Sequence, residues 1–168
     1  TKELLLTIDT LPDTVHSVLH DMHGHNAVSS AVNAAIRAFP GIWMHYCFNA
    51  EYLFFPFCET RTVQELVTFN SEERRDTILT FVVDLYSNQL GTHPDAVSLD
   101  AAHLDRSGYY ALARTDDAGE TLERQMDFFG GLRWRFEEHV PWTKRRIDRV
   151  SLFKAYKGLR LSEDHTFN

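Results

Sequence analysis

One apolar run constrains the fold of this chain more than any other feature. Residues 78–86, with the sequence ILTFVVDLY, are apolar at every position except Thr80 and Asp84. A run of this length, rich in β-branched and aromatic residues, is typical of a strand covered on both faces. We therefore expect residues 78–86 to form a central strand of a sheet.

A second strand is expected in an aromatic segment that precedes this run. Seven of the 21 aromatic residues lie in residues 43–57, between Gly41 and the turn around Pro56. This density predicts a buried strand followed by a turn. Because neighbouring side chains on a strand point to opposite faces, Phe54, Phe55 and Phe57 cannot all be buried, and some should be exposed.

Capping and periodicity place the helices. Thr62 and Glu65 have the spacing of a capping box. Asn26 precedes an apolar stripe at helical spacing that stops at Pro40 and Gly41. An earlier strand at residues 3–8 is followed by a helix that ends at about Met22. A long loop is expected at residues 87–107. Weaker strands are expected after it, at residues 109–113, 150–156 and 159–161.

These elements predict one α/β domain over residues 1–168, with a mixed sheet flanked by helices. No segment reaches the roughly 18 apolar residues of a membrane span. The two cysteines, Cys47 and Cys58, exclude a disulfide framework, so we expect a reducing, cytoplasmic location. The chain begins with Thr1 rather than Met, which leaves open a fragment or a processed product.

The charge of the chain is unevenly distributed. Residues 132–160, the basic segment, contain nine bases and three acids and carry +6, whereas the rest of the chain carries −13. Such a segment in an acidic protein suggests one small anionic ligand, such as a phosphate, or a solvated basic surface. We do not expect nucleic acid as a partner, because the acidic remainder would repel a long polyanion.

A glycine pair opens the basic segment. Gly130 and Gly131 allow close approach of the backbone to a ligand. Arg133 and Arg135 follow at a spacing that suits bidentate binding of a diphosphate. A tight turn before an amphipathic strand explains the same residues without a ligand.

Two histidine patterns are candidates for other chemistry. His16, His20 and His23 would share one helix face, beside His25 and Asp21, which is a starting geometry for a zinc site or an exposed stripe. The helix lacks the glutamate of a zinc protease. His45 and Cys47 share a face of the expected strand, where Cys47 is expected to be a small buried residue rather than a nucleophile.

The segment WMHYCFNAEYLFFP, residues 43–56, resembles the central strand and acidic turn of bacterial glycosyltransferase family 2. Its Glu51 and Pro56 match the end of that motif. Phe48 and Ala50 stand where the family has the two acids of Asp-x-Asp, so the motif is degenerate, and Asn49 with Glu51 keeps the acid spacing one residue later. Four further segments resemble the family in the same order: residues 58–66, 82–86, 128–136 and 150–167.

The resemblance implies a GT-A-like fold that binds a nucleotide-sugar through a divalent ion, Mn²⁺ or Mg²⁺. It implies that Asn49, Glu51 and His165 contact the metal or the diphosphate. The N-terminal nucleotide-binding half of the family is shorter here. From position alone, Asp127, with Glu138 behind it, is the candidate base for an acceptor hydroxyl, and a helix-capping or salt-bridging role is the alternative.

Three functions follow as hypotheses. The first is a glycosyltransferase that transfers sugar from a nucleotide-sugar donor to an unknown acceptor. The second is a non-catalytic binding or assembly domain with a degenerate GT-A-like fold. The third is a His-rich metal-binding protein. Peripheral contact with a membrane and homo-oligomerisation stay open in all three.

Overall fold

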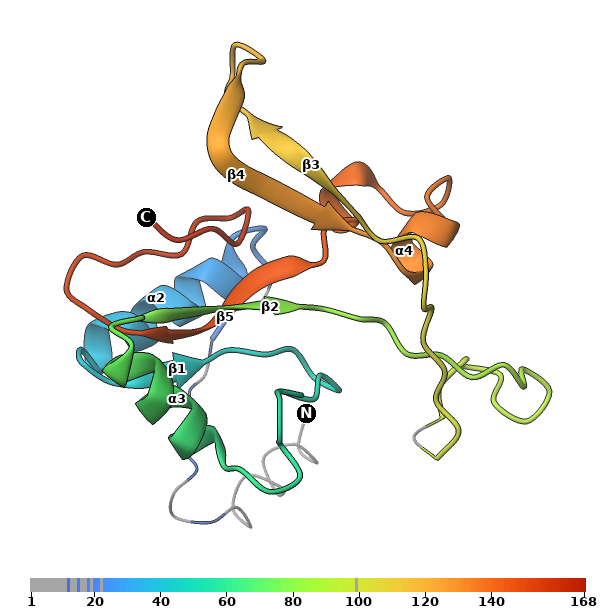
Figure 1. Ribbon diagram of the computed structural model, residues 1–168, viewed down its shortest axis with the longest axis horizontal. Coiled ribbons are helices and arrows are strands. Elements are labelled where there is room, and N and C mark those ends of the chain that lie inside the picture. The colour runs from blue at the N-terminus through green and yellow to red at the C-terminus, as the bar shows by residue number, and fades with distance from the viewer. Residues whose placement is uncertain (1–11, 13–14, 16–17, 19, 22, 99) are drawn as a thin grey trace. The chain divides into compact units, whose positions relative to one another are not determined.

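The computed structural model describes the chain except for residues 1–11, 13–14, 16–17, 19, 22 and 99. The strand expected at residues 3–8 lies outside the described residues, as does most of the helix expected before Gly24. The chain divides into two compact units, residues 1–40 with 156–168, and residues 41–155. Helices occur together with two small antiparallel sheets, so the protein is of mixed α/β type, as predicted (Figure 1).

The first unit is built on helix α2, Ala27–Ala38. The helix follows Asn26, as predicted, and ends before Phe39 and Pro40, since a residue before proline avoids the helical conformation. Asn33 of this helix holds the C-terminal segment, because its side chain donates to the carbonyl of Leu161 (2.9 Å) and accepts from the same residue's amide (2.8 Å).

The second unit contains a three-stranded antiparallel sheet in the order β1-β5-β2. Strand β1 is Trp43–His45, β5 is Asp148–Lys154 and β2 is Thr77–Phe81. The central strand is therefore β5, where Leu152 and Phe153 are almost completely buried. The strand expected in residues 150–156 is confirmed in type and is the core of the sheet.

The expectation of a central strand at residues 78–86 is wrong. Within the described part of the chain, β2 pairs only with β5 and lies at the edge of the sheet. The regular strand stops at Phe81, and one face of the run is exposed. The run is apolar on both faces although only one face is covered in the described part of the chain, so the length of the run did not predict a central position.

Helix α3, Val63–Glu72, begins with the predicted capping box. Thr62 accepts from the amide of Glu65 (3.2 Å), and Glu65 accepts from the amide of Thr62 (2.8 Å). Each side chain satisfies a backbone donor that the first turn would leave unpaired.

Strands β3, Tyr110–Thr115, and β4, Thr121–Phe129, form an antiparallel hairpin. β3 confirms the strand expected at residues 109–113, whereas β4 was not predicted. The short helix α4, Leu132–Arg135, and a 3-10 turn, Trp142–Lys144, then lead into β5. The amide of Ile147 donates to the carbonyl of Phe128 (2.8 Å), so the backbone before β5 is bonded to the end of the hairpin.

The aromatic segment is only partly strand. Phe54 and Phe57 are 77% and 74% exposed, which confirms that some of its phenylalanines cannot be buried. Cys47 is exposed, so the expectation that it is a small buried residue is wrong, because the regular strand ends at His45. Across the described residues we find no helix with the length and apolar character needed to cross a bilayer.

The glycine pair after β4 has an internal packing role. Gly130 has φ +150°, and a Cβ there would lie 2.5 Å from Cδ1 of Tyr109 and 2.6 Å from the carbonyl oxygen of Gly108. Gly131 has φ +62°, and a Cβ there would lie 3.0 Å from the hydroxyl of Tyr109. Tyr109 thus occupies the space that the absent side chains leave.

Replacing Gly130 with alanine should lower the free energy of unfolding by roughly 1–3 kcal/mol, because a methyl group would meet backbone atoms that cannot move aside. Urea denaturation would measure this change. Gly91→Ala is the matched control, since nothing lies within 4 Å of a Cβ there. Equal stability of the two variants would contradict the packing role of Gly130.

Candidate functional site

All five arginines between Arg133 and Arg149 form ion pairs with carboxylates. Three of the carboxylates lie outside the basic segment, in parts of the chain where acids predominate. These five arginines thus find their counter-charges within the second unit. The pairs are Arg133–Asp84, Arg135–Asp105, Arg145–Glu137, Arg146–Asp148 and Arg149–Glu51.

The two arginines expected to bind a diphosphate each grip a carboxylate bidentately. Arg133 donates from Nε (2.7 Å) and Nη2 (3.1 Å) to Asp84, and from Nη1 to the carbonyl of Arg146 (2.9 Å). Arg135 donates from Nε (3.0 Å) and Nη2 (2.9 Å) to Asp105, and this bonding raises the pKa of Arg135. The paired donors of each guanidinium group would fit a phosphate as well as a carboxylate. In this structure they bind Asp84 and Asp105.

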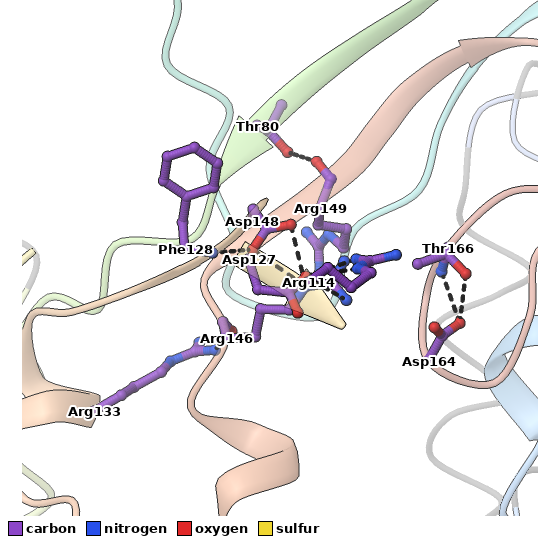
Figure 2. Close-up of polar contacts among 10 residues, drawn as sticks. All are labelled: Thr80, Arg114, Asp127, Phe128, Arg133, Arg146, Asp148, Arg149, Asp164 and Thr166. Carbon is purple, nitrogen blue, oxygen red and sulfur yellow. Dashed lines mark hydrogen bonds and ion pairs between the residues drawn. The ribbon is translucent and has the colours of Figure 1, made fainter. Parts of the chain in front are cut away.

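The candidate base Asp127 is a residue of β4, and its carboxylate lies between the guanidinium groups of Arg114 and Arg146. Its Oδ1 accepts from Nη2 (2.6 Å) and Nε (3.1 Å) of Arg114, and lies 3.4 Å from Nη1 of Arg146. Figure 2 shows these side chains beside Asp148. This is the salt-bridging role that the sequence left open for Asp127.

Asp148 joins the hairpin to the sheet. Its carboxylate is 6% exposed and accepts from Nε of Arg146 at 3.1 Å. Oδ1 of Asp148 also accepts from the amide of Phe128 (2.8 Å), which is drawn in Figure 2. A buried carboxylate is stable only when it is paired and hydrogen-bonded, and Asp148 is both.

Glu138, the second candidate base, lies at the surface. Its side chain is 64% exposed, and Oε1 lies 3.7 Å from Nε2 of His139. Its carboxylate is therefore accessible to a ligand, in contrast to that of Asp127, which is 24% exposed.

The acidic turn follows β1 and places Glu51 against the central strand. Oε2 of Glu51 accepts from the amide of Phe48 (2.8 Å) and from Nη2 of Arg149 (2.5 Å), and Oε1 accepts from Nη1 of Arg149 (3.2 Å). Ala50 has φ +63°, a left-handed conformation that closes the turn. The acid expected to bind a ligand is thus paired with an arginine of β5.

Aromatic rings surround the guanidinium of Arg149. Its central carbon lies 5.1 Å from the ring centroid of Tyr46 and 5.3 Å from that of Phe48. Both rings offer a π face to the cation. Arg149 is 11% exposed at its side chain, and its Nε has no hydrogen-bond partner in the described part of the chain.

The cluster shifts the pKa values of its members. Burial raises the pKa of Tyr46 to about 12. Burial and the positive charge of Arg149 lower the pKa of His45. Burial alone would raise the pKa of Glu51, but the hydrogen bonds from Arg149 and from the amide of Phe48 hold it below its usual value.

Asn49 and Glu51, two of the residues proposed as metal ligands, lie together on the acidic turn after β1. Both carboxylate oxygens of Glu51 are bonded to Arg149, a cation that cannot lose its proton. Asn49 is exposed on the turn, and His165 belongs to the other compact unit. In the described part of the chain no three residues of His, Cys, Asp or Glu are grouped to hold a metal.

The histidine face is only partly described. His16 lies outside the described residues. Nε2 of His20 lies 3.0 Å from the carbonyl oxygen of Ala27, and His25 lies 3.5 Å from Glu163. The zinc hypothesis therefore stays a prediction from the sequence.

Sequence reasoning missed Arg149 as a site residue and missed the acids that pair with the basic segment. One signal was available for Arg149: the sequence RRIDRV places charged residues at the start of a strand that is otherwise apolar. A charge on a buried strand needs a partner. The identity of that partner was not available, because Glu51 is 98 residues away.

Comparison with protein-family models, curated proteins and solved structures finds no match to this chain.

Replacing Arg133 with lysine should lower the free energy of unfolding by roughly 1.5–3 kcal/mol, because an ammonium group cannot reproduce the planar fork on Asp84. Arg61→Lys is the matched control, since the pair of Arg61 with Glu65 is exposed and should contribute little to stability. Urea denaturation would measure both changes. Equal effects would indicate that the Arg133–Asp84 pair contributes no more than a surface pair.

Proposed function

We propose that this chain is a glycosyltransferase-like domain with a GT-A-like arrangement, acting in the cytoplasm on a nucleotide-sugar donor. The observation that carries the proposal is the pairing of β1 with β5. The resemblance assigns β1 to the central strand before the acidic turn, and most of β5 to the closing strand. The two segments are neighbours in one antiparallel sheet, with Trp43 opposite Lys154 and His45 opposite Leu152. This pairing supports the view that both belong to one glycosyltransferase-like domain.

The acidic turn gives further support. Glu51 lies in the turn after β1 and is fixed by the backbone amide of Phe48 and by the side chain of Arg149 in β5. A turn whose conformation is fixed in this way is a preorganised part of a site, although the Glu51 carboxylate itself is already occupied by Arg149.

Under this proposal the acceptor is a hydroxyl group. A base removes its proton as the oxygen attacks the sugar carbon and the nucleotide diphosphate leaves. Glu138 is the better candidate for the base, because its carboxylate is accessible, whereas that of Asp127 is held by Arg114 and Arg146. Gly130, Gly131, Arg133 and Arg135 are the proposed diphosphate contacts, and a bound diphosphate would have to compete with Asp84 and Asp105.

Calorimetric titration of the protein with UDP and with GDP should give saturable binding in the micromolar to millimolar range. Glu138→Gln should leave this binding unchanged, because a base that acts on the acceptor does not hold the nucleotide. Absence of any binding at millimolar nucleotide would remove the glycosyltransferase proposal.

A non-catalytic assembly domain is the second candidate, and one observation favours it. Four alternate residues along and beyond β2 form an exposed apolar row with exposures between 41% and 50%. An edge strand with such a row is a surface on which another chain can add. The residues of this row are Leu79, Phe81, Val83 and Leu85.

If the apolar row mediates assembly, light scattering after size exclusion should give a mass above 19.4 kDa that rises with concentration. Val83→Lys should return the mass to that of one chain, because a charge on the row opposes its burial. Thr68→Lys is the control at an exposed position on helix α3, outside the strand that carries the row. A single-chain mass at every concentration would count against this candidate.

A further inference from the structure

The carboxylate of Glu51 already has a cation. Three donors converge on it, the two terminal nitrogens of Arg149 and the amide of Phe48. The guanidinium group carries its charge at every physiological pH. The negative charge that a divalent ion would neutralise at this turn is therefore neutralised by the protein.

The guanidinium is fixed in this position. Its side chain is 11% exposed, and the rings of Tyr46 and Phe48 lie at cation–π distance from it. If a metal ion displaced it from Glu51, a charged group would remain at a largely buried position without a carboxylate. Displacement is for that reason strongly opposed.

The rest of the turn offers a divalent ion little. Mg²⁺ and Mn²⁺ prefer several oxygen ligands, yet Phe48 and Ala50 have no side-chain oxygen. The carbonyl of Phe48 already accepts from the amide of Glu51 (3.2 Å). Besides Glu51, Asn49 is the one residue between positions 48 and 51 whose side chain carries an oxygen that could ligate a metal.

We propose that Arg149 is the resident cation of the acidic turn, and that this chain binds its nucleotide donor without a divalent metal at Glu51. The inference about the donor rests on the glycosyltransferase proposal. The inference that Arg149 is the cationic partner of Glu51 does not, and the two parts can be tested separately.

The first experiment is a double-mutant cycle with Glu51→Gln, Arg149→Met and the double variant, measured by urea denaturation in EDTA. We expect strong non-additivity, because removing the second member of a pair costs little once the first is absent. Additive effects would overturn the role of Arg149. The exposed pair Arg61–Glu65 gives the control cycle, in which coupling should be weak. If either single variant is poorly folded, the double variant still gives a result, because it leaves no unpaired charge. Its free energy of unfolding is then compared directly with that of the unaltered protein.

The second experiment measures metal dependence with the unaltered protein. The protein is titrated with Mn²⁺ alone, and bound ion is followed by electron paramagnetic resonance. The unaltered protein and Glu51→Gln should bind the same amount of Mn²⁺, because Glu51 is not a ligand. UDP and GDP should bind with affinities in EDTA and in Mn²⁺ that agree within about twofold. An increase of about tenfold or more with Mn²⁺, abolished in Glu51→Gln, would overturn the inference and leave the glycosyltransferase proposal intact. No nucleotide binding in either buffer would remove the glycosyltransferase proposal and the donor part of the inference with it, while the Mn²⁺ titration alone would still decide whether Glu51 binds metal.

Discussion

Pairing between guanidinium groups and carboxylates organises residues 41–155. The pairs connect β5 to the acidic turn, α4 to the segment after β2, and the hairpin to the start of β5. Asp148 is the point on which the hairpin depends, since it accepts from both Arg146 and the amide of Phe128. Burying charges is unfavourable unless each finds its partner, so these contacts select one arrangement of the segments more than they add to its stability.

Local signals predicted local structure well. The capping box at Thr62 and the stop at Pro40 identified the starts and ends of helices because they act within a few residues. The order of the strands was not predictable in the same way. Residues 78–86 have the stronger apolar run, but β5 is central because it pairs with strands on both sides, which depends on residues far away in sequence.

The candidate site shows the same division. Sequence reasoning singled out Glu51, Arg133 and Arg135 as contacts to a metal or a diphosphate, and the structure shows each of them in an ion pair within the chain. It could not tell an external anion from an internal one, since a carboxylate and a phosphate satisfy a guanidinium group in the same geometry. Asp84 lies in the apolar run and Asp105 in the expected loop, where neither was singled out as a partner, and the structure pairs them with Arg133 and Arg135.

The contact between the acidic turn and β5 has a consequence for sequence change in this chain. Introducing aspartates at positions 48 and 50 would not by itself create a metal site, because Arg149 would compete for each added carboxylate. Such a change would also remove the ring of Phe48 from the guanidinium group. Substitutions at two places separated by 98 residues are therefore coupled, and a mutational path that alters one of them alone passes through a variant with an unpaired charge.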